Sequence, residues 1–473
     1  YGYNATLTLP ALGGAGSLNA NKALIIDTTP PVVSSVSSTT AAGTYKQGSV
    51  ISIQVVFNES TMVVDTTNGS PTLTLETGAV DEEATYVNLT GGNTLNFTYT
   101  VQPGDQSPDL DYVSALSLNL NGSTIKDGVF ANNATLILPN PGMANSLSVN
   151  EALVIDGVSA YVTNVSSSKS NGYYSIGTII LVRVSFSKPI IVTGAPQLLL
   201  ETGPTDRFAT YLSGSASSML VFKYVVQPQD TSLDLDYVAN DVLTLNGGTI
   251  RDTVANDADL TLPEPAAPGS LGANKNIVID TTPPRMLSIA RSVPSGATTN
   301  AATVKFAVTY SEPVTGVAAG DFSLEVTGVD GAAIIPASIG GFGTEWTVEV
   351  DTGTGSGTVG LNAASSDGPS VDVAGNKRSG ALTGEVDAID KTAPEVIAIN
   401  RSVPLTATTR ALSVRFAVTF SEPVTGVAAG DFTLDVTGGG VTGASITAVN
   451  GSGTSWTVDV DTGFGDGPIR LDA

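Results

Sequence analysis

Residues 303–322 read TVKFAVTYSEPVTGVAAGDF and residues 413–432 read SVRFAVTFSEPVTGVAAGDF, so nearly the same stretch occurs twice, 110 positions apart. Each copy begins with apolar residues at every second position, as at Val304, Phe306 and Val308. An apolar period of two predicts a β-strand with one buried face. The sequence therefore predicts two similar β-domains in tandem in this part of the chain.

A second type of repeat precedes these two. The motif Leu-Glu-Thr-Gly at 75–78 returns at 200–203, and the motif Asn-Ala-Thr-Leu occurs at both 4–7 and 133–136. The start of the chain thus matches the end of a repeat. The predicted organisation is an orphan C-terminal part of a repeat at 1–27, repeats of the first type at 28–156 and 157–280, and repeats of the second type at 281–390 and 391–473, the last one incomplete.

The composition is typical of an all-β protein. The chain has 51 Gly and 25 Pro among 473 residues. Turn formers and β-branched residues are abundant, whereas good helix formers are scarce. We therefore expect almost no helix. Short alternating strands in units of about 110–130 residues favour β-sandwiches made of two sheets over barrels.

Composition also excludes several classes of function. The formal net charge is −24 with 20 Lys and Arg, so we expect no nucleic acid partner, because phosphate binding needs clustered positive charge. No apolar stretch has the roughly 20 residues needed for membrane insertion. Cys and His are both absent, which removes disulfides, thiol nucleophiles and the commonest general base. We expect that the protein is not an enzyme.

The joints between repeats are rich in proline. Residues 27–31 and 280–284 both read DTTPP, and residues 390–394 read DKTAP. Proline fixes φ and favours extended geometry in the preceding residue, so these joints predict stiff connectors. The joint at 156–158 reads DGV and has no proline. A different angle or a closer interface is expected there.

The DTTPP joint, the Ser-Glu-Pro-Val entry at 311–314 and the Asp-Val-Ala-Gly-Asn motif at 372–376 resemble a known family. The chain is similar to the tandem bacterial-type immunoglobulin-like repeats of large extracellular surface proteins, adhesins and fibrils. This resemblance covers nearly the whole chain. It implies tandem Ig-like Greek-key β-sandwich domains in an elongated string, an extracellular or cell-surface location, and a load-bearing or adhesive role. It implies no catalytic residue.

The two ends of the sequence look complementary. The last repeat stops at the counterpart of Ala363 and lacks an equivalent of 364–390, while 1–27 form a spare tail of the same length. In one interpretation, the tail of one subunit inserts into the incomplete sandwich of the next, which builds a head-to-tail homopolymer. In the other, the chain is a window of a longer polypeptide and its ends are arbitrary.

Two functions follow as hypotheses. The first is a structural subunit of an extracellular filament or fibril that assembles with copies of itself. The alternative is a stalk, or a ligand- or carbohydrate-binding segment, of a large cell-surface adhesin, with a glycan or surface ligand as partner. Carbohydrate sites usually use exposed aromatic residues, and the 2 Trp lie in alternating strands where core packing is the simpler explanation.

Aspartates two positions apart suggest calcium. In an extended segment such residues project to the same side, and Ca²⁺ prefers several oxygen ligands. No complete calcium-loop motif is present, and the alternative is that these aspartates simply face water. The candidate ligands are Asp105, Asp109 and Asp111 in one repeat and Asp230, Asp234 and Asp236 in the next.

Several asparagines lie in Asn-x-Ser/Thr triplets, the acceptor motif for N-linked glycans. Such triplets also arise by chance in a chain rich in Ser and Thr, so unmodified polar residues are the alternative. The candidate sites are Asn4, Asn58, Asn68, Asn88, Asn96, Asn121, Asn133, Asn164, Asn400 and Asn450. Glycans would mask exposed sheet faces and protect the chain from proteases.

Overall fold

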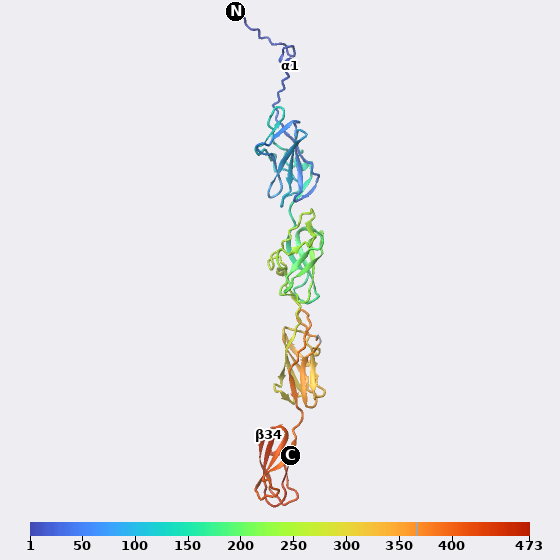
Figure 1. Ribbon diagram of the computed structural model, residues 1–473, viewed down its shortest axis with the longest axis vertical. Coiled ribbons are helices and arrows are strands. Elements are labelled where there is room, and N and C mark those ends of the chain that lie inside the picture. The colour runs from blue at the N-terminus through green and yellow to red at the C-terminus, as the bar shows by residue number, and fades with distance from the viewer. Residues whose placement is uncertain (366–367) are drawn as a thin grey trace. The chain divides into compact units, whose positions relative to one another are not determined.

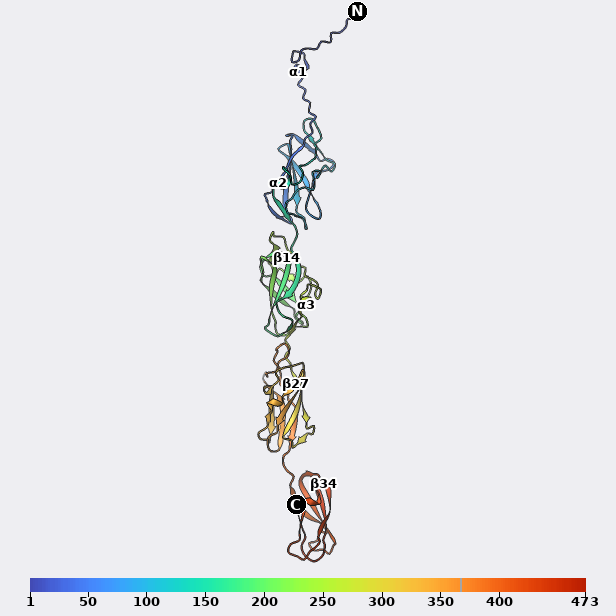
Figure 2. The same cartoon turned by 180° about the vertical axis from the view of Figure 1, so that it is seen from behind.

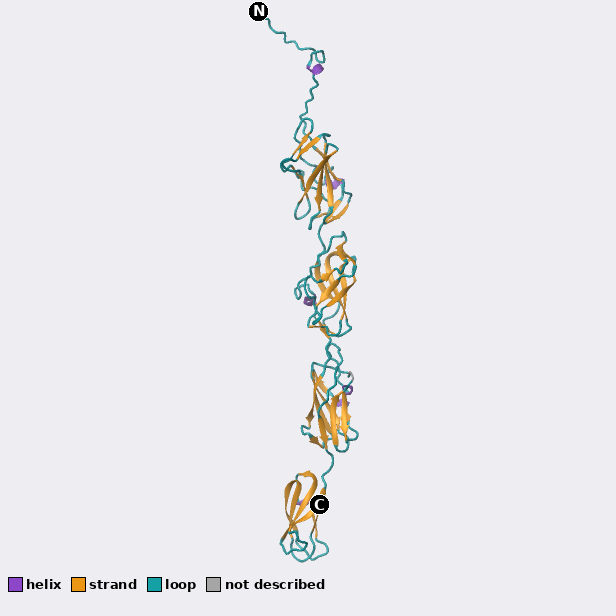
Figure 3. Cartoon of the chain, viewed as in Figure 1, coloured by secondary structure: helices purple, strands orange, loops and turns teal. Residues whose placement is uncertain are grey.

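The computed structural model describes residues 1–365 and 368–473. The protein is all-β: strands account for 46% and helices for 4% of it. Figure 3 shows the helices as short purple turns among orange strands. By its contacts the chain divides into two units, Tyr1–Thr282 and Pro283–Ala473, and each unit contains two sandwiches. No helix of the described residues is both long and apolar enough to cross a bilayer.

The first sandwich follows an extended N-terminal segment that carries the short helix α1, Leu18–Asn21. The larger sheet has the order β1-β3-β7-β6-β5-β9, and the smaller has the order β2-β11-β8, with β4 paired to β10. The bounds are β1 Val33–Ser38, β2 Gly43–Lys46, β3 Val50–Phe57, β4 Met62–Asp65, β5 Thr72–Leu75, β6 Glu82–Thr90, β7 Thr94–Thr100, β8 Gln106–Ser107, β9 Leu118–Asn119, β10 Thr124–Asp127, α2 Leu147–Asn150 and β11 Leu153–Asp156.

The second sandwich repeats this plan. Its larger sheet has the order β12-β14-β17-β16-β15-β19, with β20 also paired to β14, and its smaller sheet has the order β13-β21-β18. The bounds are β12 Val162–Ser167, β13 Gly172–Tyr174, β14 Ile179–Thr193, β15 Gln197–Leu200, β16 Arg207–Ser213, β17 Ser217–Val225, β18 Thr231–Ser232, β19 Leu243–Thr244, β20 Thr249–Asp252, α3 Leu271–Asn274 and β21 Ile277–Asp280. Figure 2 labels β14 and α3.

One sheet of the third sandwich has the order β22-β24-β28-β26, with β27 also paired to β28. The other sheet has the order β23-β30-β29-β25. The fourth has β31-β32-β34 in one sheet and β33-β35 in the other (Figure 1 labels β34). The bounds are β22 Met286–Val293, β23 Thr298–Thr299, β24 Thr303–Tyr310, β25 Phe322–Thr327, β26 Ala333–Ile334, β27 Gly340–Phe342, β28 Glu345–Asp351, β29 Gly357–Ala363, β30 Val386–Ile389, β31 Val396–Val403, β32 Ser413–Val424, β33 Thr433–Asp435, β34 Ser445–Asp461 and β35 Arg470–Asp472.

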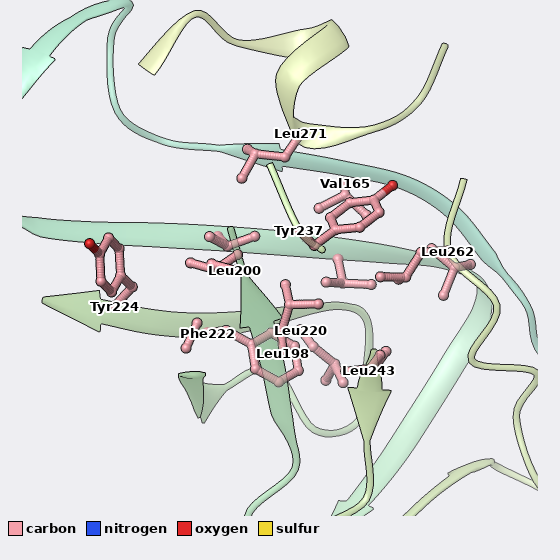
Figure 4. Close-up of a cluster of buried hydrophobic side chains, with 14 of the residues drawn as sticks. Val165, Leu198, Leu200, Leu220, Phe222, Tyr224, Tyr237, Leu243, Leu262 and Leu271 are labelled. Atoms are coloured by element: carbon pink, nitrogen blue, oxygen red, sulfur yellow. The ribbon is translucent and has the colours of Figure 1, made fainter. Parts of the chain in front are cut away.

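The predicted alternation is what builds each core. In β24, Val304, Phe306 and Val308 are buried while the residues between them are half-buried. Figure 4 shows the core of the second repeat, in which Tyr237 lies among aliphatic side chains that include Val165, Leu200 and Leu271. The Tyr237 hydroxyl donates a hydrogen bond to the carbonyl of Pro263, so the polar end of this buried ring is satisfied. The sandwiches therefore hold together without disulfides.

Candidate assembly site in the fourth repeat

Strand β30 completes the third sandwich. It lies between β23, to which it is parallel, and β29, to which it is antiparallel. The segment that leads to β30 also covers the open end of the core, because the Leu382 carbonyl accepts a hydrogen bond of 2.8 Å from the Ala363 amide. A backbone bridge between Thr315 and Val371 adds two more hydrogen bonds. The tail of this repeat is thus an integral part of its second sheet.

The same tail satisfies a buried carboxylate. Asp321 is 0% exposed, and its Oδ1 accepts hydrogen bonds from the Ser370 amide at 3.2 Å and the Ser370 hydroxyl at 2.6 Å. The Arg378 guanidinium, which is 1% exposed, has its Nε 3.5 Å from the same oxygen. The other oxygen, Oδ2, accepts the Ala318 amide at 3.0 Å. A buried charge is tolerated only when it is paired in this way.

The fourth repeat lacks these partners. Its residues correspond to those of the third repeat 110 positions earlier, and its second sheet contains only β33 and β35 among the described residues. Ile289 and Tyr310 are buried in the third repeat, whereas their counterparts Ile399 and Phe420 are only half-buried. Of the described residues, 15 apolar side chains form the buried third core and 6 form the fourth. Among the described residues, the fourth sandwich is therefore open along one side.

A hollow of about 340 Å³ marks the opening. It is lined by Val396, Phe420, Thr425, Asp431 and Phe432, together with the neighbouring Val424, Gly426, Val427 and Ala473. These residues are the counterparts of positions that the third-repeat tail covers, such as Thr315 and Asp321. Asp431 is exposed, and its Oδ2 accepts the Ala428 amide at 2.8 Å, as Asp321 does with Ala318. The hollow therefore lies where the tail of the third repeat packs in that repeat.

Glu422 of the same repeat has one carboxylate oxygen without a hydrogen-bond partner among the described residues. The Oε1 atom of Glu422 is inaccessible to solvent and has no hydrogen-bond donor among the described residues. Burying an acceptor without a donor costs roughly 1–3 kcal/mol. Glu422 follows the strand residue Phe420 by two positions. The open side of the fourth repeat carries the exposed carboxylate of Asp431 as well as apolar surface.

The N-terminal segment exposes apolar side chains along its length. Its apolar residues are exposed, with Leu7 at 89%, Leu24 at 68% and Ile26 at 86% exposure. The sequence ALIID at 23–27 matches ALVID at 152–156, which contains β11, but residues 23–27 form no strand. Residues 23–27 thus have the pattern of a final strand but pair with no other strand among the described residues.

The repeats in the sequence predicted the strands around this hollow. They did not predict a role for the carboxylate of Asp431 or for the guanidinium of Arg378. Asp431 stands at the end of the repeated stretch, just before the core residue Phe432. A charged residue that precedes a buried aromatic residue in both copies was the available signal. Arg378 lies in a tail that the sequence carries in only one repeat of this type, so no repetition marked it.

The six aspartates predicted to bind calcium are mostly engaged by the protein itself. In the first repeat, Asp105 is buried and accepts hydrogen bonds from the Tyr99 hydroxyl and the Gln102 amide. Asp111 accepts from the Gly142 amide at 3.0 Å and the Ser148 hydroxyl at 2.6 Å. Asp109 is exposed, and its Oδ1 lies 3.3 Å from the Leu153 amide. These carboxylates anchor loops.

The second repeat follows the same pattern. Asp230 accepts from the Tyr224 hydroxyl at 2.6 Å and from Arg207 at 2.9 Å. Burial, and then this bond to Asp230, raises the pKa of the Tyr224 hydroxyl, so it remains a donor. Asp236 accepts the Ala266 amide at 2.9 Å, and Asp234 is exposed with a pKa raised chiefly by desolvation.

Among the described residues, no three of the six predicted aspartates bring carboxylate oxygens within 4.8 Å of one another. Calcium binding by these residues stays a prediction. The geometry gives most of them a structural role in holding loops, because buried carboxylates are stabilised by backbone amides.

The predicted glycan acceptors are mostly accessible. Asn96 and Asn164 are half-buried and take part in side-chain hydrogen bonds, Asn96 with Gln54 and Asn88, and Asn164 with Asn274. The exposed acceptors are Asn4, Asn58, Asn68, Asn88, Asn121, Asn133, Asn400 and Asn450. Glycosylation stays a prediction at all of them.

Comparisons with known proteins add little. No family model matches the chain, and no curated protein matches it. Among solved structures, the chain is similar to the crystal structure of the S-layer protein rSbsC(31-844), with 12% identity and a TM-score of 0.16. The match covers 92% of this chain and 63% of that one. A TM-score this low establishes nothing about function in this chain.

Proposed function

We propose that this protein is a structural subunit of an extracellular surface assembly. The observation that carries the proposal is the open fourth sandwich, with its hollow, its exposed core and its free sheet edge. An open edge of this kind is a template for strand addition by another chain. The all-β repeats and the absence of Cys and His are consistent with a role that needs no catalysis.

In its specific form, the proposal is head-to-tail assembly. Residues 1–27 of one subunit would fill the β30 position in the fourth repeat of the next. Leu24 and Ile26 would then face the core, as Leu153 and Ile155 do in the first repeat, where both are buried. Because donor and acceptor are different surfaces, repetition of the contact gives an open filament.

The test uses cysteines, since the chain has none of its own. In the third repeat Thr358 pairs with Ala388. The corresponding positions are Pro468 in the acceptor and Ile25 in the donor. We expect a chain with Ile25→Cys and Pro468→Cys to form a ladder of disulfide-linked oligomers on mild oxidation. The combination of Leu12→Cys and Pro468→Cys is the control that should form none.

Removal of residues 1–27 should leave a monomer in sedimentation velocity at every concentration, whereas the full chain should associate as its concentration rises. A full chain that stays monomeric, with no disulfide ladder, would sink head-to-tail assembly.

A hollow in the second repeat favours a second candidate function, the binding of acidic carbohydrate. It has a volume of about 320 Å³ and is lined by Arg207, Phe208 and Lys223 on β16 and β17. Phe208 is 48% exposed. At the matching positions the first repeat has Glu82, Glu83 and Thr98. Lys223 beside an exposed aromatic ring, with Arg207 also held by Asp230 at 2.9 Å, suits an anionic sugar.

This candidate predicts retention of the chain on dextran sulfate but not on neutral dextran at physiological salt. The double substitution Arg207→Glu and Lys223→Thr, which restores the residues of the first repeat, should abolish that retention. Lys169→Met is the matched control for loss of a lysine elsewhere in the same repeat. Unchanged retention of the double variant would reject the site.

A further inference from the structure

We propose that the outer face of the larger sheet in the second repeat binds the loop at 78–83 of a second copy of this chain. The face is formed by β14, β17 and β16, and it offers apolar side chains together with cations. The loop offers an apolar side chain together with carboxylates. The contact joins chains side by side, so it goes beyond head-to-tail assembly and involves neither the N-terminal segment nor the fourth repeat.

This face is apolar, although the solvent-facing side of an antiparallel sheet is normally polar. Buried and accessible residues alternate along β14 and β17, so every second side chain of each strand faces outward. Among the outward residues, Ile179 is 45% exposed, Phe208 48% and Met219 38%. Ile179 lies opposite Val225, so the apolar side chains continue from strand to strand. An exposed apolar surface of this kind marks a contact site.

Two cations lie on the same face. Lys223 lies opposite Leu181, and Arg183 lies opposite Val221. Among the described residues, neither Lys223 nor Arg183 has a carboxylate oxygen within 4.0 Å. The chain as a whole carries a formal net charge of −24. Cations without a carboxylate partner in so acidic a chain favour an acidic partner, and another copy of the chain is one.

The first repeat differs from the second at this face. In place of Arg183, Lys223 and Phe208 it has Gln54, Thr98 and Glu83. The same sheet is therefore apolar and basic in the second repeat, but polar and acidic in the first. Opposite chemistry on equivalent surfaces allows one repeat to bind the other in a neighbouring chain.

The loop at 78–83 has the chemistry that the face needs. Val80 is 68% exposed, and the carboxylates of Asp81 and Glu83 beside it are exposed as well. The buried Thr77 fixes the loop, because its hydroxyl donates to the Val80 carbonyl at 2.8 Å and accepts the Glu82 amide at 3.0 Å. A loop that is already ordered loses little entropy on binding.

The loop and the face cannot meet within one chain. Phe208 is the counterpart of Glu83, so the two occupy equivalent places in successive repeats and are one repeat length apart. The contact therefore needs a second copy. A single contact of this size is small and leaves separate chains monomeric, but many such contacts add up where an assembly aligns its chains.

A sugar accounts for only part of this face. The hollow in the second repeat is lined by Phe208 and Lys223, but not by Ile179 or Arg183. A protein loop with an apolar residue between carboxylates uses the apolar and the basic side chains together. The observations therefore favour the loop over an acidic carbohydrate as the occupant of the whole face.

The experiment traps the contact with cysteines, since the chain has none of its own. One full chain carries Val80→Cys and another carries Phe208→Cys, and the two are mixed in equal amounts under mild oxidation. We expect the mixed disulfide to form about fivefold or more faster than with Tyr173→Cys in the second chain. Tyr173 is 51% exposed, much as Phe208 is, but it lies in β13 of the other sheet.

Charge reversal tests the pairing. Lys223→Glu in the Phe208→Cys chain should slow the mixed disulfide about threefold, and Glu83→Lys in the Val80→Cys chain should restore its rate. Lys275→Glu is the matched control, because Lys275 is exposed and lies beside the smaller sheet, just before β21. This control should leave the rate unchanged.

A mixed disulfide that forms no faster than the Tyr173→Cys control would overturn the contact. A fast disulfide that is insensitive to both charge reversals would overturn the pairing of the cations with the acidic loop. Retention on dextran sulfate without a fast mixed disulfide would assign the face to acidic carbohydrate and would equally overturn the proposal. The head-to-tail ladder uses positions 25 and 468, so either kind of assembly can fail while the other stands.

Discussion

Asp387 is a carboxylate at a core position. It lies in β30, is 0% exposed, and neither of its oxygens has a hydrogen-bond partner among the described residues. The same position of the final strand is Leu153 in the first repeat and Ile277 in the second. Burial raises the pKa of Asp387, with Arg291 acting in the opposite direction and Glu385 in the same direction as burial. Folding of the third repeat therefore shifts the proton equilibrium of this residue toward the acid.

The direction of this pKa shift predicts how the stability of the third repeat depends on pH. A carboxyl group whose pKa is raised on folding binds its proton more tightly in the folded state, so it destabilises the third repeat progressively as the pH rises above the unfolded pKa of about 4. Asp387→Leu should remove this dependence and stabilise the repeat at pH 7 by about 2 kcal/mol or more. Asp351→Leu, at an exposed position, is the control.

The measurement is urea unfolding followed by tryptophan fluorescence at pH 4 and pH 7. In a Trp456→Phe background, Trp346 is the only remaining tryptophan and reports the third repeat. A parent chain that is equally stable at both pH values, or a less stable Asp387→Leu chain, would contradict the assignment.

At the scale of single elements, the final strand of each repeat has a special position. β11, β21 and β30 each join a parallel and an antiparallel neighbour, so each closes its sandwich between strands that are distant in sequence. Such a strand contributes many backbone hydrogen bonds but lies at the end of its repeat. It is the element that another chain could supply most easily.

Most elements were predictable from the sequence, because strands with one buried face leave an alternating pattern. Val304, Phe306 and Val308 show this pattern, and all three are buried. The site was only partly predictable. The repeats show that the sequence up to Ala473 holds no counterpart of residues 364–390, but the pairing of Asp321 with Arg378 joins residues 57 positions apart that no local pattern connects. Such long-range pairs are fixed by packing alone.

The predicted calcium ligands have hydrogen-bond partners that their spacing in the sequence does not reveal. Alternation places Asp109 and Asp111 on one side of an extended segment. In the structure Asp111 accepts hydrogen bonds from Gly142 and Ser148, while Asp109 lies near the Leu153 amide. Competition from backbone amides could not be read from spacing, because the donors come from a later part of the repeat.

At the scale of the molecule, the joint between the first two repeats is closely bonded. The Gly157 amide donates to the Asp105 carbonyl at 2.7 Å, and a Cβ at this glycine would meet the Gln102 carbonyl at 2.3 Å. Asn256 of the second repeat donates to the Asp156 carbonyl and accepts from the Gln47 amide. The joint without prolines is thus fixed by contacts with both repeats.

Lys188 is the charged part of this joint. Its ammonium donates to Asp156 Oδ1 at 2.7 Å and to the Val158 carbonyl at 2.6 Å. The matching residues of the later repeats are Glu312 and Glu422. Lys188 therefore neutralises Asp156 and ties the connector to the second sandwich.

Lys188→Met should loosen the connector without unfolding either repeat, since a half-exposed ion pair contributes only about 1 kcal/mol. We expect the amides of Gly157 and Val158 to exchange hydrogen several-fold faster, measured by mass spectrometry on peptides that span the joint. Lys188→Glu should act more strongly, because it places a second carboxylate beside Asp156. Lys169→Met, which removes a lysine away from the joint, should leave exchange there unchanged. Equal exchange in all four chains would show that the backbone contacts of Gly157 and Asn256 alone hold the joint, and that Lys188 has no part in it.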